Sequence, residues 1–254
     1  MAELYSHSKL WLFESCAEAY KIKYIEKTFP DIPKSVELFL GDIVHQSLEW
    51  FYEEIKKGNS HDADDLITKY AELWQENFLA NLRSREGPEH YFNKGIRFLV
   101  DYYYKNKPFI DNTIEIEKKI TFPLDSEKKY MIQGYVDRIV LNAAGEYEVH
   151  DYKTNEYIKT QQQVDADRQL AFYHLGLQED FGPDIKVKLV WHFLAHNKTI
   201  LSTRTPEQLQ KLKSDTFQLI KKIESNVDWQ SCNKPWCDWC SFKKNNNLPA
   251  QKFL

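Results

Sequence analysis

The run "YEVHDYKTN", residues 147–155, places Asp151 two residues before Lys153. In a β-strand, residues two apart point to the same face, so this carboxylate and this ammonium group would lie together. Such a pair could take part in hydrolysis at a metal site, or it could be an ordinary solvated strand end. The acidic-x-Lys pattern recurs at Glu54/Lys56, Glu117/Lys119, Glu127/Lys129 and Asp184/Lys186. The pattern alone therefore does not decide between the two interpretations.

A second carboxylate, Asp137 of "GYVDRIV", is brought to Asp151 by the expected turn between them. If "NAAGE", residues 142–146, is a five-residue turn, the numbers of opposed residues sum to 288, and Asp137 faces Asp151. Directly opposed residues share a face, with Cβ atoms about 4.5–5.5 Å apart. A turn one residue longer or shorter would send the two acids to opposite faces.

Two opposed carboxylates repel each other, so the fold must compensate for their charge. A divalent cation does this best, because Mg²⁺ binds one or two protein carboxylates and completes its shell with water and substrate phosphate. The sequence therefore predicts a metal site at this hairpin.

Helical residues could complete the site. His45 lies off the apolar stripe of its expected helix, and Gly41 lies one turn before it. Glycine costs about 1 kcal/mol inside a helix, which suggests that a ligand or another backbone approaches there. Gln169 and Tyr173 are four apart and share one face of a later helix, where they could hold phosphate or the sheet.

The elements expected to position these residues are mostly helices in the first half of the chain and mainly strands from residue 113 onward. Helices are expected around residues 38–58, 62–82, 89–106, 161–177 and 206 onward, and strands around 113–122, 130–141, 147–154, 185–195 and 198–204. An apolar stripe indicates the first helix, and Thr205, Pro206 and Gln208 are typical of a helix start. The stripe consists of Leu40, Val44, Leu48, Phe51 and Ile55. The pattern predicts an α/β fold with a helical insertion.

Composition narrows the functional class. The chain has 254 residues, of which 42% are hydrophobic and 15% aromatic, enough to bury a sizeable core. Its net charge of −4 is not that of a protein held on nucleic acid by bulk electrostatics. Contacts with nucleic acid would use local basic patches, or metal ions that bridge acids to phosphate. No apolar run of membrane-span length and no signal peptide are visible, so we expect a cytoplasmic protein without a membrane partner.

The four cysteines are unevenly distributed. Cys16 stands alone, whereas Cys232, Cys237 and Cys240 lie in "SCNKPWCDWC". In a chain without a secretory signal, such crowding favours ligation of a metal or a cluster over disulfides.

With these residues assembled, the chain resembles the PD-(D/E)XK nuclease superfamily, and specifically its RecB-like branch. That branch includes the nuclease domains of the RecB and AddB proteins and the CRISPR-associated RecB-like exonucleases. The matching motifs, in chain order, are "SKLWLFESCAEAYKIKY", "GDIVHQSLEW", "GYVDRI", "VHDYKT", "QLAFYHL" and "CDWCSF". Each motif is weak alone, but their order from residue 5 to about 242 makes the match specific.

The resemblance implies a fold and a domain organisation. It implies a restriction-endonuclease-like core, with a central mixed β-sheet flanked by helices, an N-terminal helical region and a C-terminal cysteine-rich tail. We expect a single domain over residues 1–254, with a helical insertion at about 59–110 and a nuclease core at about 111–204. Cys16 and residues 232–240 would form a cysteine clasp.

The resemblance also implies roles for individual residues. His45, Asp137, Asp151 and the backbone carbonyl of Tyr152 would bind Mg²⁺ or Mn²⁺, and Asp137, Asp151 and Lys153 would be catalytic. Lys153 would position or activate the attacking water. Gln169 and Tyr173 would form a supporting pair near the DNA.

The cysteines would hold a 4Fe-4S cluster, as in many members of this branch. Cys16, Cys232, Cys237 and Cys240 supply the four thiolates that a cluster needs. The usual spacing of this tail is Cys-x2-Cys-x5-Cys, and here Asn246 occupies the last position. Structural Zn²⁺ is the main rival, and free thiols are the third reading.

These features predict a metal-dependent deoxyribonuclease, an exonuclease on single-stranded or end-bearing DNA. It would act in phage DNA metabolism, repair, recombination or CRISPR-type processing. The chain has no GxxxxGK[ST] loop, so it would act alone or with a partner such as a helicase. The alternatives are a catalytically inactive module that binds nucleic acid, and a structural subunit built around its metal or Fe-S centre.

Overall fold

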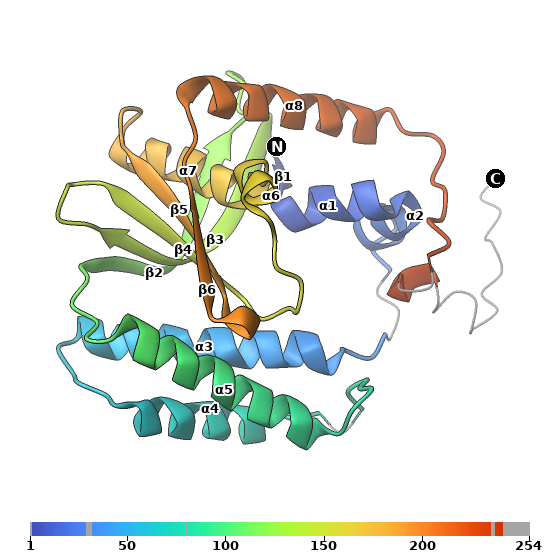
Figure 1. The fold of residues 1–254 in the computed structure, drawn as a ribbon. Helices are drawn as coiled ribbons and strands as arrows, with labels where there is room; N and C mark the ends of the chain where they lie inside the picture. The colour runs from blue at the N-terminus through green and yellow to red at the C-terminus, as the bar shows by residue number, and fades with distance from the viewer. Residues whose placement is uncertain (1, 29–31, 80, 235–236, 241–254) are drawn as a thin grey trace. The chain divides into compact units, whose positions relative to one another are not determined.

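A computed structural model describes residues 2–28, 32–79, 81–234 and 237–240 (Figure 1). Asn246 lies outside the described residues. The chain divides into two compact units, which we call the larger and the smaller unit. The larger unit consists of Lys34–Phe122 and Gln133–Gln210, and the smaller unit of Met1–Pro33, Pro123–Ile132 and Lys211–Leu254.

Three long helices open the larger unit: α3 (Val36–Lys56), α4 (Ala63–Asn77) and α5 (Pro88–Asn106). The Ser35 side chain accepts a hydrogen bond from the Leu38 N–H and caps α3. Gly58 follows that helix with a φ of 89°, as expected for the glycine that ends it. Pro88 occupies the first turn of α5, where the missing N–H costs nothing.

The strands of the larger unit form a mixed sheet. Strand β4 (Tyr147–Lys153) lies between β3 (Tyr130–Leu141) and β5 (Val187–Phe193), and β6 (Lys198–Ser202) follows β5. The β3–β4 and β5–β6 pairs are antiparallel, whereas β4 and β5 are parallel. Strand β2 (Thr113–Pro123) pairs with β3 beside this order.

The turn between β3 and β4 has the predicted length. Leu141 pairs with Tyr147, and the ladder continues to Arg138 opposite His150, so opposed numbers sum to 288. Asn142 shapes this turn, because its side-chain oxygen accepts from two backbone N–H groups within it. The predicted register is therefore confirmed over these pairs.

The connection from β4 to β5 corrects one prediction. Instead of one helix over residues 161–177, the structure has α6 (Gln161–Asp165) and α7 (Arg168–Phe181). Asp167 adopts an extended conformation between them, and its side chain accepts from the Gln169 N–H at 2.7 Å. Aspartate at such a position satisfies a free N–H of a new helix, and so it starts α7 separately. Helix α7 contacts β4 and β5.

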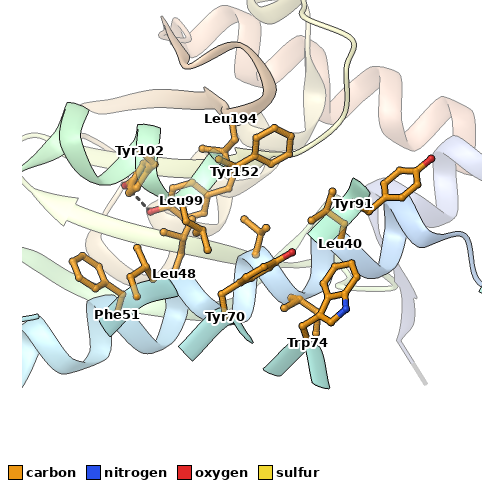
Figure 2. Close-up of a cluster of buried hydrophobic side chains, with 14 of the residues drawn as sticks. Leu40, Leu48, Phe51, Tyr70, Trp74, Tyr91, Leu99, Tyr102, Tyr152 and Leu194 are labelled. Atoms are coloured by element: carbon orange, nitrogen blue, oxygen red, sulfur yellow. Dashed lines mark hydrogen bonds between the residues drawn. The ribbon is translucent and has the colours of Figure 1, made fainter. Parts of the chain in front are cut away.

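The main core of the larger unit lies between helices α3, α4 and α5 and the sheet (Figure 2). Tyr152 of β4 and Leu194, just after β5, pack against the helices. The Tyr102 and Tyr152 hydroxyls are 3.2 Å apart, which satisfies polar groups inside this apolar layer. The other labelled side chains are Leu40, Leu48, Phe51, Tyr70, Trp74, Tyr91 and Leu99.

The smaller unit contains the N-terminal elements: β1 (Glu3–Tyr5), α1 (His7–Ser15), α2 (Ala17–Tyr20) and a π-helical turn (Lys21–Ile25). Strand β1, which the sequence did not reveal, runs parallel to the start of β3. Helix α8 (Pro206–Glu224) begins in the larger unit and continues into the smaller one. Thr205 and Gln208 form the predicted capping box at its start. The predicted fold class, a mixed sheet flanked by helices with a helical N-terminal region, is confirmed.

Among the helices of the described residues, none combines the length and the apolar character needed to cross a membrane.

Gly95 of α5 provides a test of the helical layer. A Cβ at this position would overlap the Tyr70 ring and lie 2.8 Å from Leu40 Cδ1. We expect Gly95→Ala to destabilise the protein by about 1–3 kcal/mol in urea unfolding, although alanine is the better helix former. Exposed Asn93 on the same helix is the control, because Asn93→Ala should gain helix propensity without a clash. Equal or greater stability of Gly95→Ala would contradict the packing.

Candidate active site and cysteine centre

Asp137 and Asp151 lie where the β3–β4 ladder ends. Beyond the Arg138–His150 pair, the Tyr152 N–H donates to Asp137 Oδ2 at 2.8 Å. A carboxylate of β3 thus accepts the hydrogen bond of a β4 backbone group. Asp151 is buried, with 2% of its surface exposed. The hairpin therefore places both carboxylates beside the same stretch of β4.

Lys153 lies within this group of acids. Its Nζ is 2.7 Å from Asp151 Oδ2 and donates to Gln169 Oε1 at 3.0 Å. Gln169 Nε2 donates to Asp151 Oδ1 and to the Tyr173 hydroxyl, each at 3.1 Å. Gln169 of α7 therefore contacts Asp151 and Lys153 directly, and Tyr173 contacts Gln169.

Tyr173 reaches this position because Gly134 of β3 has no side chain. A Cβ at Gly134 would lie 2.7 Å from Tyr173 Cε1, closer than side chains approach. The glycine of "GYVDRI" thus lets the tyrosine ring lie against the strand that carries Asp137.

His45 of α3 reaches β4 through the backbone. Its Nε2 is 2.7 Å from the Tyr152 carbonyl oxygen. A carbonyl only accepts, so Nε2 carries the proton and Nδ1 keeps its lone pair. That Nδ1 lies 3.5 Å from Asp137 Oδ2. Metal-binding histidines commonly donate their other N–H to a carbonyl in this way.

Two of the four predicted metal ligands, Asp151 and the Tyr152 carbonyl, already have other partners in this structure. The Tyr152 carbonyl accepts from His45, and both Asp151 oxygens have partners in Lys153 and Gln169. The metal-binding roles of Asp151 and the Tyr152 carbonyl stay predictions. Gly41 meets the predicted close approach in part, since a Cβ there would lie 3.1 Å from Thr154 Oγ1.

Sequence reasoning missed Glu117 of β2. One ligand atom each of His45, Glu117 and Asp137 lies within 4.8 Å of the other two. Glu117 has a φ of 48°, which is uncommon for a residue other than glycine. In the sequence it was one of the recurrent acidic-x-Lys patterns, and nothing distinguished it from the others.

Burial and mutual repulsion shift the titration of this site. Burial raises the pKa of Asp137 to about 6, and Asp151 adds to the effect while His45 opposes it. Burial, Asp137 and Glu49 raise the pKa of Glu117 to about 7. Burial alone would lower the pKa of Lys153, but the carboxylates of Asp151 and Asp137 raise it above its ordinary value.

Glu117 and Asp137 line a cavity of about 560 Å³, whereas Asp151 and Lys153 are not among its lining residues. Its acidic lining residues are Glu37, Asp42, Glu49, Glu117, Asp137 and Glu156. Lys94 is the lysine in the lining, and it is paired with Glu156. Such a cavity attracts cations and repels free phosphate. Two carboxylates and an imidazole also match the donor atoms that Mg²⁺ and Mn²⁺ accept, so the residues fit a divalent ion.

A buried polar network holds β4 from its other face. Arg138 donates to the Tyr152 hydroxyl at 3.1 Å, to Asp111 at 2.6 Å and to His150 Nδ1 at 3.0 Å. Because a guanidinium only donates, Nδ1 accepts and the His150 proton lies on Nε2. Burial, with Arg138 nearby, holds the pKa of His150 well below its usual range, so the imidazole is neutral. The network thereby anchors Tyr152, whose backbone contacts both His45 and Asp137.

The four cysteines meet in the smaller unit. One Sγ each of Cys16, Cys232, Cys237 and Cys240 lies within 4.8 Å of the others. The Cys16–Cys240 and Cys232–Cys240 sulfur distances are 3.8 and 3.6 Å. Four thiolates about 2.3 Å from one Zn²⁺ would be about 3.8 Å apart. In a 4Fe-4S cluster each thiolate binds a different iron, which requires wider spacing. The Cys16–Cys240 and Cys232–Cys240 distances are close to the value for a single tetrahedral ion, and the other pairs lie within 4.8 Å.

The shifted pKa of Asp137 gives a testable pH dependence. An aspartate titrates near 3.8 when unperturbed and at about 6 in this fold. Its contribution to stability is therefore complete below about pH 4 and is lost as the pH rises through about 6. In metal-free buffer, Asp137→Asn should lose less stability than the wild type over this range.

Urea unfolding with EDTA at several pH values measures this difference. Asp215→Asn, on the exposed face of α8, is the control and should follow the wild-type slope. An unchanged slope in Asp137→Asn would contradict the assignment.

Comparison with known proteins identifies the fold and the family of the chain. A solved structure described as a "Putative exonuclease" from Eubacterium rectale has a TM-score of 0.57 at 13% identity, covering 99% of this chain and 91% of that one. At this identity the likeness shows the fold alone. The structure described as SSO0001 has 16% identity and covers 89% of this chain and 92% of its own, but its TM-score of 0.36 is too low to support an argument. No curated protein matches the sequence. The family model of the PD-(D/E)XK nuclease superfamily matches residues 5–244, and the chain therefore belongs to that superfamily.

Proposed function

We propose that this nuclease is a metal-dependent deoxyribonuclease of the RecB-like branch, acting as an exonuclease. One observation carries the proposal: Asp137, Asp151, Lys153 and Gln169 are linked around β4, and His45 joins them through the Tyr152 carbonyl. The resemblance assigns catalysis to Asp137, Asp151 and Lys153, metal binding to His45, and a supporting role to Gln169.

Each side chain has a task that its contacts support. His45 and Asp137 would hold the cation, and Asp151 would join them when the Lys153 contact is exchanged for a ligand contact. A bound divalent ion would lower the pKa of its water and stabilise charge on the phosphate. Lys153, held charged by Asp151, would orient the attacking water and offset negative charge at the scissile phosphate. Gln169 would fix the Lys153 amine, and Tyr173 would fix Gln169.

The cavity supports a DNA end as the substrate. Its acidic lining gives phosphate no direct counter-charge, so a strand would be held near the site through the cation. A cavity of about 560 Å³ accommodates a strand end more readily than an intact duplex. We propose single-stranded or end-bearing DNA as the substrate. Phage, recombination or CRISPR-type processing would be the setting, with a helicase as a possible partner.

Lys153→Ala tests the enzyme directly. Loss of an oriented charge at the phosphate should lower the cleavage rate by about a hundredfold or more. Release of end-labelled nucleotides from single- and double-stranded DNA, with Mg²⁺ or Mn²⁺, measures this rate. Lys188→Ala is the matched control, because Lys188 lies on neighbouring β5 and pairs with Glu146 outside the site.

Each outcome of this assay has a different meaning. Metal-dependent cleavage that survives in Lys153→Ala would overturn the assigned role. Wild-type binding without cleavage would indicate an inactive DNA-binding module. Absence of both would favour a structural subunit.

We further propose that the cysteine centre holds one structural Zn²⁺. The sulfur spacing supports this ion over the 4Fe-4S cluster that the resemblance implies. Leu12, Ala19 and Trp239 surround the centre, as expected for a structural site. Cys16 would tie the segment between α1 and α2 to the C-terminal cysteines.

Metal analysis of anaerobically purified protein tests the cysteine centre. We expect a colourless protein with about one zinc per chain. Cys16→Ser should lose most of the zinc and lower the melting temperature, whereas removal of the Asp137 carboxylate should leave the zinc content unchanged. A brown protein containing iron and sulfide would instead establish the cluster.

A further inference from the structure

We propose that Glu117 is a ligand of the divalent cation, and that His45, Glu117 and Asp137 together form one face of its binding site. The inference deepens the proposed function, on which it rests for the identity of the cation as a divalent ion. None of the sequence motifs points to Glu117, because it lies on β2, outside all of them.

The first argument is the convergence of three different donors. Helix α3, strand β2 and strand β3 each contribute one, and the chosen atoms all lie within 4.8 Å of one another. Two donors of one ion lie at most twice the ion–ligand distance apart, which is about 4–5 Å for distances of about 2.0–2.6 Å, so this limit is of the size that a shared ion allows.

The second argument is independent and comes from the imidazole. The Tyr152 carbonyl fixes the His45 proton on Nε2, so the Nδ1 lone pair is directed toward the Asp137 side. This is the tautomer and the backbone anchor that metal-binding histidines use.

The third argument concerns the charged groups around Glu117. Asp151 has Lys153, but no lysine or arginine forms an ion pair with Glu117 among the residues that the structure describes. Instead it faces the carboxylates of Asp137 and Glu49. A carboxylate in such surroundings is stabilised when a cation binds.

The backbone of β2 is irregular at Glu117. The left-handed φ of Glu117 interrupts the extended conformation within β2. A residue with this φ departs from the regular alternation of a strand. Glu117 is a lining residue of the cavity.

Titration with Mn²⁺, followed by electron paramagnetic resonance of the full chain, tests the proposal without any measurement of cleavage. Glu117→Gln should weaken Mn²⁺ binding at least tenfold. Glu49→Gln is the matched control, because Glu49 lines the same cavity but lies outside the three-donor group. It should change the affinity no more than about threefold, since it alters only the general charge.

Thermal unfolding provides a second test, because the melting temperature of Glu117→Gln should lie above that of the wild type without metal and lose this advantage when Mn²⁺ is added. Without metal, Glu117→Gln should melt at a higher temperature than the wild type, because one of the repelling carboxylates is gone. Saturating Mn²⁺ should raise the melting temperature of the wild type and have a much smaller effect on the variant. Glu117→Gly, which suits the left-handed backbone, repeats both measurements if Glu117→Gln does not fold.

Wild-type Mn²⁺ affinity in Glu117→Gln would overturn the proposal, as would an equal loss in Glu49→Gln. Failure of the nuclease proposal looks different, because Mn²⁺ would still bind through Glu117 while DNA remained intact. Conversely, cleavage by the wild type with unchanged Mn²⁺ binding in Glu117→Gln would leave the enzyme and remove Glu117 from its ligands.

Discussion

Repulsion between carboxylates is the constraint on which this site depends. Asp137, Asp151 and Glu117 are brought together by three neighbouring strands, and each of them raises the cost of ionising another. The fold compensates this repulsion to a different extent for each of the three carboxylates. Asp151 receives Lys153 and Gln169, Asp137 receives a backbone N–H, and Glu117 receives neither. The remaining negative charge would favour a cation in the cavity.

The scaffold holds these groups in place from both faces of β4. On one face, Gln169 and Tyr173 of α7 contact the acids and the lysine. On the other face, Arg138 ties Tyr152 to the buried hydrogen-bond network beside the core of Figure 2. Because Tyr152 cannot move without breaking these bonds, its carbonyl and N–H remain available to His45 and Asp137. A ligand set held in this way needs little rearrangement to accept an ion.

Much of this arrangement could be predicted because it follows from short-range rules. The five-residue turn determined which residues of β3 and β4 face each other, and helical periodicity put Gln169 and Tyr173 on one face. Gly41 and Gly134 lie where another chain segment approaches, although only the first attracted notice. Other features depend on contacts that no local pattern reports. The φ of Glu117 arises from its place in the sheet, and β1 is a three-residue strand recognisable only by its pairing with β3.

Asp167 has a consequence for how this site can vary among related chains. Asp167 starts α7 as a separate helix. The direction in which Gln169 and Tyr173 point is therefore set by this cap and by the packing of α7 on β4 and β5. This direction does not depend on the orientation of α6. Changes in the exposed stretch 155–157, ahead of α6, would therefore leave in place the helix face that contacts Asp151 and Lys153. This stretch is a place where natural diversity in substrate contacts could accumulate while the reaction centre stays the same.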